Sequence, residues 1–384
     1  FSVSRASAYS AQAYAVLDAD TGVLLDGANE NQQMPMASTT QIMPGLLAAE
    51  SGALQKIVTV SGASAGVEGS SMYLKQGEQL SLQDVLYGLM LCSGNDAAAC
   101  IAENLGGQTV FVRRMNERAQ QLGLRNTHFD NPSVLDGKFA ASSMFMWWFQ
   151  SSGLDGKTHH TTAQELAQLT AAALKDPVFA QIVATQRYTS GTRTMVNHNK
   201  LLRMYPDAIG VKTGYTRTAG RCLVSAAKRN GRTVAAVTLH DGDDWNDHMH
   251  MLDAAFSSLR EKRFGQAGDT AAPISVQSGT KQKIQAVYQE DLTAQLFDRE
   301  QAEIQISHAD FLYAPVRQGD ICGSAKLLCN GAVLDETALI CAQSVALDTE
   351  QEDTSLLEKI RHWWDAVRKR EAVYENYRSL RAKS

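Results

Sequence analysis

The chain is 384 residues long, and because single domains usually run to about 100–200 residues, this length predicts two or more domains. Apolar residues make up 44% and charged residues 20%, which is typical of a globular protein with a sizeable core. The net charge of −5 lacks the basic excess of nucleic-acid binders, and no apolar run reaches the roughly 18 residues that a membrane span needs.

The first elements along the chain are a hairpin and two capped helices. Residues 12–25 consist of two β-rich runs around a turn rich in Asp and Gly, which predicts a hairpin. Apolar residues recur at helical spacing from 38 to 50, and we predict that this helix begins with Ser38 as its N-cap. Residues 81–91 repeat the pattern with Ser81 as the N-cap.

The remainder of the first region alternates helices with a second hairpin. Asn230-Gly231 separates two apolar runs within residues 219–239, and this dipeptide is a strong signal for a two-residue hairpin turn. An antiparallel sheet flanked by helices, with a helical subdomain beside it, is therefore predicted, which is an α+β fold. Helical spacing marks four further segments: residues 96–104, 110–122, 163–174 and 244–259.

The pattern of apolar and polar residues changes after residue 264. Short alternating segments separated by Gly and Asn-Gly turns predict a small all-β domain over residues 272–346. A charged linker then leads into an amphipathic helical tail within residues 347–384. The adjacent Trp363 and Trp364, together with a local excess of Lys and Arg, favour contact with a membrane surface. Docking of this helix on the β-domain or on a partner protein is the alternative.

The six cysteines indicate neither a metal site nor a disulfide framework. None forms a C-x-x-C pair, and no His/Cys cluster has the spacing of zinc ligands, so we expect no metal and no cofactor. Buried free thiols are the simplest interpretation. A bridge within the last three, with no assigned pairing, is the alternative. The cysteines are Cys92, Cys100, Cys222, Cys322, Cys329 and Cys341.

Three short motifs together supply the parts for acyl transfer through a serine ester. Ser38 opens an apolar helix, Ser93-Gly94-Asn95 lies in the turn between two helices, and Lys212-Thr213-Gly214 lies at the start of a strand. A hydroxyl nucleophile needs a base, its oxyanion needs preorganised N–H donors, and a substrate carboxylate needs a fixed cation. Each motif alone is weak, but their order and context together are rare.

With these motifs in their surroundings, the sequence resembles the low-molecular-mass penicillin-binding proteins, specifically the serine-type D-alanyl-D-alanine carboxypeptidases. The matching text includes "PMASTTQIM", "LCSGNDAA" and "IGVKTGYTRTAGRCLVSAAKRNGRTVAAVTL". The resemblance implies a penicillin-binding/β-lactamase-like transpeptidase domain over residues 1–264. It also implies a β-sandwich-like domain over 272–346 and a linker with an amphipathic tail over 347–384.

The resemblance also implies a role for each motif residue. Ser38 becomes the acyl-ester nucleophile, and the backbone N–H groups of Ser38 and Tyr215 form the oxyanion hole. Ser93 relays protons, and Asn95 hydrogen-bonds the substrate amide. Lys212 supports the relay and, with the Thr213 of the Lys-Thr-Gly motif, holds the terminal carboxylate.

The implied partners are peptidoglycan pentapeptides ending in D-Ala-D-Ala, β-lactam antibiotics and a membrane surface, with no nucleic acid. The implied location is extracytoplasmic, at the outer face of the cytoplasmic membrane.

Gln41 departs from the family pattern, which has a lysine three residues after the nucleophile. A Gln amide has no useful basicity, and loss of a general base usually costs about 10²–10⁴-fold in rate. Three interpretations stay open. The chain is an inactive homologue that binds wall peptides, or a variant altered to trap a complex, or Lys212 supplies residual basicity through Ser93. A β-lactamase is a further alternative, for which the β-domain and tail are unnecessary.

Two other segments depart from the pattern. Pro44-Gly45 lies deep inside a helix that begins at Ser38, so a kink below the nucleophile is expected. Residues 133–152 insert a strongly apolar stretch where the family pattern has almost nothing. This insertion is interpreted as a small subsidiary core or as a flap or partner-facing patch.

Overall fold

The computed structural model describes residues 9–133, 158–349 and 360–364. Unit 1 contains the chain up to Lys262 together with Gln295–Ala302 and Cys329–Ala332, and unit 2 contains the rest. The insertion predicted to form a subsidiary core or flap, and most of the tail, lie outside the described residues. Among the described helices, none combines the length and apolar character that crossing a bilayer requires.

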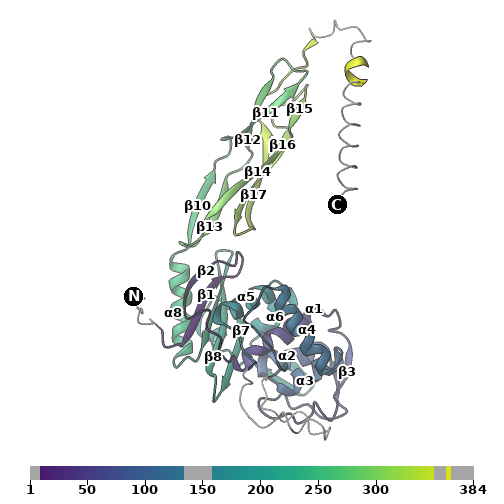
Figure 1. The fold of residues 1–384 in the computed structure, drawn as a ribbon, viewed down its shortest axis with the longest axis vertical. Helices are drawn as coiled ribbons and strands as arrows, with labels where there is room; N and C mark the ends of the chain where they lie inside the picture. Colours follow the sequence, from purple (N-terminus) through teal and green to yellow (C-terminus); the bar gives the residue numbers. More distant parts are fainter. Residues whose placement is uncertain (1–8, 134–157, 350–359, 365–384) are drawn as a thin grey trace, which may run out of the picture. The chain divides into compact units, whose positions relative to one another are not determined.

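Unit 1 is built on a five-stranded antiparallel sheet (Figure 1). The turn at Asn230-Gly231 has φ values of 49° and 79°, as a two-residue hairpin requires, so the predicted hairpin is confirmed. The strand order is β2-β1-β9-β8-β7, with bounds Leu24–Ala28, Ala13–Asp18, Arg232–Leu239, Gly220–Arg229 and Ala208–Thr216. Lys212 therefore lies in the middle of a strand and not at its start.

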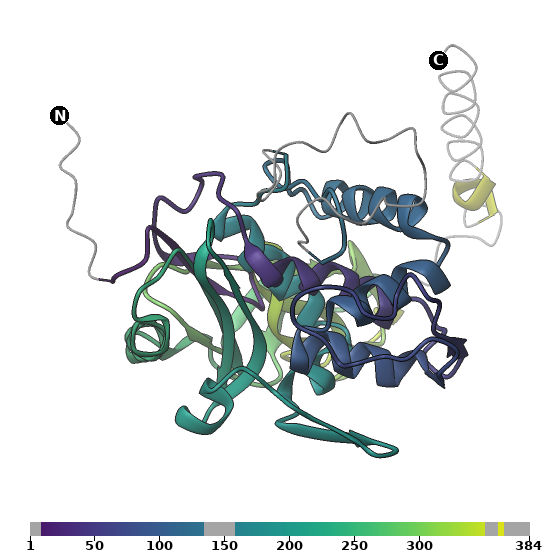
Figure 2. The ribbon, with the colours of Figure 1, turned by 90° about the horizontal axis from the view of Figure 1, so that it is seen from below.

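Both faces of this sheet are covered, which is why β1 is buried along its whole length (Figure 2). Side chains alternate between faces along a strand. Ala15 and Leu17 face the main core under the helical subdomain, whereas Tyr14 and Val16 face a second core that includes helix α8, Asp244–Ser257. The α+β prediction is confirmed.

The helical subdomain carries the segments that bear the site. Ser81 caps α2 as predicted, and a capping box joins it to Asp84. The elements are the 3₁₀ helix η1 Ala37–Gln41, α1 Ile42–Glu50, α2 Leu82–Cys92, α3 Asn95–Asn104, α4 Gln108–Gln121, α5 Ala163–Leu174, α6 Pro177–Ala184 and α7 Leu201–Met204, with the strand pairs β3 Ile57–Thr59 with β4 Gln79–Ser81, and β5 Arg187–Ser190 with β6 Arg193–Val196.

The predicted helix start at Ser38 is wrong, and its correction removes the expected kink. Ser38 lies inside η1, and the α-helix begins only at Ile42. Pro44 is therefore in the first turn, where a missing N–H leaves no hydrogen bond unmade. Gly45 has a packing reason, because a Cβ there would lie 2.7 Å from Met90 Sδ. The Pro44-Gly45 pair thus fits a well-formed α1.

The described part of unit 2 that precedes the tail is all β, as predicted. Its main sheet has the order β14-β16-β17-β12-β11-β15, and β10 pairs separately with β13. The bounds are β10 Arg260–Gly265, β11 Thr270–Gln277, β12 Lys283–Tyr288, β13 Leu292–Leu296, β14 Ala302–His308, β15 Phe311–Tyr313, β16 Ile321–Cys329 and β17 Ala332–Cys341. In the tail, residues 360–364 are helical.

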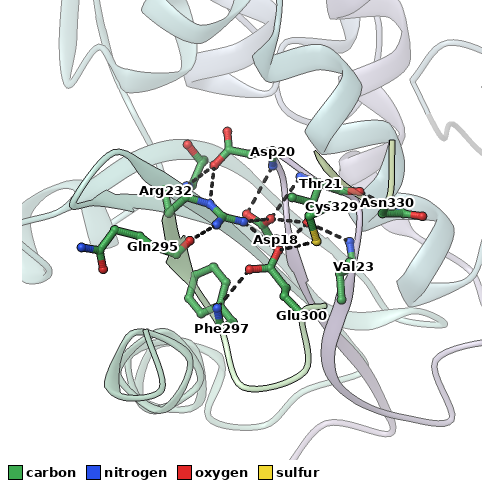
Figure 3. Close-up of polar contacts among 11 residues, drawn as sticks. Asp18, Asp20, Thr21, Val23, Arg232, Gln295, Phe297, Glu300, Cys329 and Asn330 are labelled. Carbon is green, nitrogen blue, oxygen red and sulfur yellow. Dashed lines mark hydrogen bonds and ion pairs between the residues drawn. The ribbon is translucent and has the colours of Figure 1, made fainter. Parts of the chain in front are cut away.

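A buried ionic cluster joins β1, β9 and the segment Gln295–Ala302 inside unit 1 (Figure 3). Arg232 donates to Asp18 and, at 2.7 Å, to Glu300 Oε1. Burial raises the pKa of Asp18, and its hydrogen bond to Glu300 adds to this. Burial also acts to raise the pKa of Glu300, but hydrogen bonds from Asp18, Thr21 and the other donors outweigh it and hold that pKa low. Burial and hydrogen bonding thus move the two carboxyl pKa values in opposite directions beside one guanidinium.

Replacing Arg232 with methionine is expected to lower the free energy of unfolding by about 3–5 kcal/mol, because two fully buried carboxyl groups lose their cation. Urea unfolding followed by circular dichroism measures the change. Arg113→Met is the matched control, since Arg113 forms an exposed pair with Glu117. A difference from that control below about 1 kcal/mol would contradict a stabilising role for the cluster.

Candidate active site

Ser38 lies where η1 approaches the edge strand β7. A Cβ added at Gly214 would lie 2.9 Å from Ser38 N and 3.1 Å from Thr39 N, so only glycine allows this approach. Ala37, just before the serine, has a positive φ of 47°. The contact between the two backbones therefore fixes the turn that carries Ser38.

A buried histidine holds this turn from behind. The Asp130 N–H donates to His159 Nδ1 at 3.1 Å, so the ring proton is assigned to Nε2, which faces Thr40 Oγ1 at 2.8 Å. The Thr40 hydroxyl in turn donates to Ala37 O at 2.8 Å. Burial lowers the pKa of His159 to about 4, so the ring is neutral at pH 7. This chain of hydrogen bonds supports the geometry of η1.

Gln41 lies at the end of η1, three residues after Ser38, and is fully buried. Its Nε2 donates to Ser93 O and to Asn95 Oδ1, both at 3.2 Å, and its Oε1 accepts from Ser93 Oγ at 3.1 Å. Ser93 ends α2 in a left-handed conformation with φ 59°, which turns its hydroxyl toward this group. Gln41 thus takes part in three hydrogen bonds with Ser93 and Asn95, but its amide cannot act as a base.

Lys212 supplies the only titratable amine that contacts these groups in the described part of the chain. Its Nζ donates to Ser93 Oγ and, at 2.9 Å, to Thr213 O. The side chain is 2% exposed, and no described carboxylate pairs with it. Burial lowers the pKa of Lys212 to about 7. A substantial fraction of this amine is therefore neutral, and able to accept a proton, at neutral pH.

These residues lie at a cavity of about 420 Å³. Ser38, Ser93, Thr213, Gly214 and Tyr215 line it, so three motifs far apart in sequence meet there. Gln41 and Lys212 lie behind this lining and contact it through Ser93, whereas the Asn95 N–H contacts it through Ser70 O. Five further lining residues are absent from the sequence prediction: Ser70, His198, Arg221, Asp244 and Trp245.

Arg221 provides a cation on the cavity wall, a role that the sequence reasoning gave to Lys212. It lies directly opposite Tyr215 in the β7–β8 ladder, and its Nε donates to Asp244 Oδ2 at 3.0 Å. The hydrogen bond to Asp244 raises the pKa of Arg221. The pairing register of β7 with β8 places the Arg221 side chain beside the Lys-Thr-Gly motif. Arg221 could have been found from the sequence only by predicting this register.

Replacing Gly214 with alanine is expected to lower any acylation rate at Ser38 by on the order of 10²-fold, because the added carbon displaces the turn that carries this serine. Time courses of labelling with a fluorescent penicillin measure the rate. Gly62→Ala is the control, since its Cβ meets only the flexible Gln76 side chain. Equal rates in both variants would show that the close approach is unimportant.

A serine on a tight turn, backed by a serine–lysine pair and a backbone edge at a cavity, defines a protein of the serine acyl-transfer class. A family model described as D-alanyl-D-alanine carboxypeptidase matches residues 1–243. A second model, described as penicillin-binding protein 5, C-terminal domain, matches residues 260–347. The chain belongs to the D-alanyl-D-alanine carboxypeptidase family of low-molecular-mass penicillin-binding proteins, which confirms the resemblance seen in the sequence.

Individual relatives agree with this assignment. D-alanyl-D-alanine carboxypeptidase DacF from Bacillus subtilis is 29% identical over 355 residues, which cover 88% of this chain and 86% of that protein. D-alanyl-D-alanine carboxypeptidase DacB2 from Mycobacterium tuberculosis is 36% identical over 234 residues, covering 60% and 75% respectively. The structure of penicillin-binding protein 5 from Haemophilus influenzae shares the fold, with a TM-score of 0.62 at 24% identity over 89% of this chain and 99% of that one.

Proposed function

We propose that this chain is a slow serine acyl-transfer enzyme that removes the terminal D-Ala from peptidoglycan stem peptides, with Lys212 and Ser93 in place of the missing base. The contact between Lys212 Nζ and Ser93 Oγ carries the proposal, because it connects an amine with a pKa of about 7 to the cavity that Ser38 lines. The family supports the substrate class.

In the proposed reaction, Ser38 Oγ attacks the carbonyl carbon of the penultimate D-Ala. Its proton passes to Ser93 Oγ as the Ser93 hydroxyl turns from Gln41 Oε1 and gives its own proton to neutral Lys212 Nζ. The N–H groups of Ser38 and Tyr215 stabilise the oxyanion. Collapse breaks the peptide bond, and the proton returns from Lys212 through Ser93 to the departing amine. Water then hydrolyses this peptidyl ester and frees Ser38. A β-lactam instead loses its ring C–N bond on attack and leaves the opened ring as an ester on Ser38 Oγ.

In this proposal, Arg221 and Thr213 bind the terminal carboxylate of the substrate. Arg221 lines the cavity and keeps part of its guanidinium exposed beside Asp244, whereas the Lys212 ammonium is buried behind the wall. Asn95 already uses its carbonyl oxygen for Gln41 and its amide for Glu68 O. Any contact of Asn95 with the substrate amide therefore requires one of these hydrogen bonds to be shared or exchanged.

A non-catalytic protein that binds wall peptides in the same cavity is the second candidate, and the fully buried, hydrogen-bonded Gln41 favours it. Labelling with a fluorescent penicillin separates the two. Slow labelling that approaches one label per chain, and is lost in Ser38→Ala, supports the enzyme. Reversible binding without any covalent label, together with no release of D-Ala from a D-Ala-D-Ala peptide, supports the binder.

We also propose that the chain acts outside the cytoplasm and contacts a membrane surface through its C-terminal residues. Trp363 and Trp364 are more than half exposed, and the sequence from Ser355 onward is rich in Lys and Arg. Sedimentation with vesicles that contain anionic lipid is expected to carry the full chain down, and Trp363→Ser with Trp364→Ser to abolish this. Equal sedimentation of both proteins would rule out these two residues as the contact.

A further inference from the structure

A segment outside the three motifs holds Asn95 in place. This segment, residues 68–78, is called the strap below. The Asn95 N–H donates to Ser70 O at 2.8 Å, and Asn95 Nδ2 donates to Glu68 O at 2.9 Å. Both the backbone and the side chain of Asn95 thus depend on strap carbonyls. Ser70 itself lines the cavity with Ser38 and Ser93, so the strap also forms part of the wall.

The first part of the strap is held by hydrogen bonds to Asp96 and by packing on α2. The Asp96 carboxylate accepts from Ser71 Oγ at 2.7 Å, from Met72 N at 3.0 Å and from Leu74 N at 2.9 Å. Met72 packs onto α2 where a Cβ at Gly88 would lie 2.1 Å from its Sδ. The next residue, Tyr73, has φ 62° and is 80% exposed. A bulky residue in this conformation is strained. The backbone of the strap at Tyr73 therefore has to be held by a contact from another element.

Arg193 provides that restraint from the β5–β6 hairpin. Its Nη1 donates to Glu78 Oε1 at 2.9 Å, and its Nη2 donates to Glu78 Oε2 and to Tyr73 O, both at 3.1 Å. The hydrogen bonds from Arg193 hold the pKa of Glu78 below its usual range. The single Arg193 side chain therefore holds the strap at two places, Tyr73 in its middle and Glu78 at its end.

The hairpin that carries Arg193 is itself anchored to α2. The Tyr188 ring of β5 stacks on Tyr87 with centroids 3.6 Å apart and planes at 7°. Tyr188 OH donates to Asp84 Oδ1 at 2.7 Å. The β5–β6 hairpin that carries the Arg193 guanidinium is therefore held in place by α2. Because Asn95 is hydrogen-bonded to strap carbonyls, contacts of Arg193 with the strap also affect the positions of Asn95 and Ser70.

We propose that Arg193 is a positioning residue for acyl transfer, acting through the strap. Its pair with Glu78 and its hydrogen bond to Tyr73 O keep the Glu68 and Ser70 carbonyls where they orient Asn95 and shape the cavity. The kinetic consequence rests on the proposed function, whereas the ordering of the strap does not. A lysine at this position keeps the charge but loses the fork, so it replaces Arg193 only in part.

Two readouts on the full chain test this role. Trypsin cleavage after the exposed Lys75, identified by mass spectrometry, reports release of the strap. The rate constant of acylation at saturating fluorescent penicillin reports the site. For Arg193→Gln we expect cleavage at least ~10-fold faster and acylation ~10-fold or more slower, because small misplacements of positioning groups have large kinetic effects. The melting temperature is expected to stay within a few degrees, since the pair is partly exposed.

Three further variants separate positioning from general damage. Glu78→Gln is expected to reproduce both effects, the double variant to be no worse than either single one, and Arg193→Lys to recover part of the acylation rate. Arg113→Gln, which breaks an exposed pair elsewhere, is the control. Faster cleavage with unchanged acylation, or no change in either readout, would overturn the proposal. If the parent chain is never acylated, the proposed function fails, and non-covalent penicillin affinity replaces acylation as the second readout.

Discussion

Replacing Gln41 with lysine is expected to raise the rate of acylation by penicillin by about 10²–10⁴-fold, the usual contribution of a positioned general base. The side-chain amide at this position already reaches Ser93 O and Asn95 Oδ1. A lysine amine finds the same two acceptors there. Its burial beside Lys212 keeps one of the two amines neutral at pH 7, because two adjacent buried cations repel each other.

The controls for this variant test whether the gain comes from basicity. Gln41→Met has a similar length and no base, so its rate is expected to stay at or below that of the parent. Gln41→Lys combined with Ser38→Ala is expected to take up no label. If Gln41→Lys labels no faster than the parent, the missing amine is not the cause of slow acylation, and the binder interpretation gains support.

Acylation of the parent chain is expected to rise about tenfold per pH unit below pH 7 and to level off above it, because only neutral Lys212 accepts the proton. The sign follows from the lowered pKa: the inactive ammonium form is populated below about 7 and the active amine above it. Lys212→Met is expected to lower the plateau rate by about 10²–10⁴-fold. Labelling rates measured from pH 5.5 to pH 8.5 test both statements.

Lys175→Met serves as the matched control for that series, since Lys175 is exposed and does not line the cavity with Ser38. Its pH profile is expected to follow that of the parent. A rate that is flat across the whole pH range, or a Lys212→Met protein with the parent's profile, would exclude Lys212 as the base. The thermal stability of each variant shows whether a lost rate reflects unfolding.

Much of the fold follows from local sequence. The hairpin turn at Asn230-Gly231, the cap at Ser81 and the bounds of α5 all arise from interactions within a few residues, which periodicity and turn chemistry describe well. The start of α1 does not, because a contact with distant Gly214 accompanies the 3₁₀ turn at Ser38. A non-local contact of this kind leaves no trace in residue spacing.

The candidate site divides in the same way. The three motifs identified Ser38, Ser93 and Gly214, and the structure brings them to one cavity. Arg221 and the strap were missed because their roles depend on strand register and on hydrogen bonds across long stretches of chain. The neutral fraction of Lys212 was also hidden, since its lowered pKa comes from burial by many residues and not from any neighbour in sequence.

Burial of Lys212 has a further consequence for the stability of the folded chain. The amine titrates near its ordinary value of 10.5 when the chain unfolds but near 7 when it is folded, so unfolding between these pH values takes up a proton. The contribution of Lys212 to the unfolding free energy therefore falls as pH drops from about 10.5 to about 7 and is lowest below 7. The fold thus retains a partly neutral amine at neutral pH at the expense of part of the stability that it has under alkaline conditions.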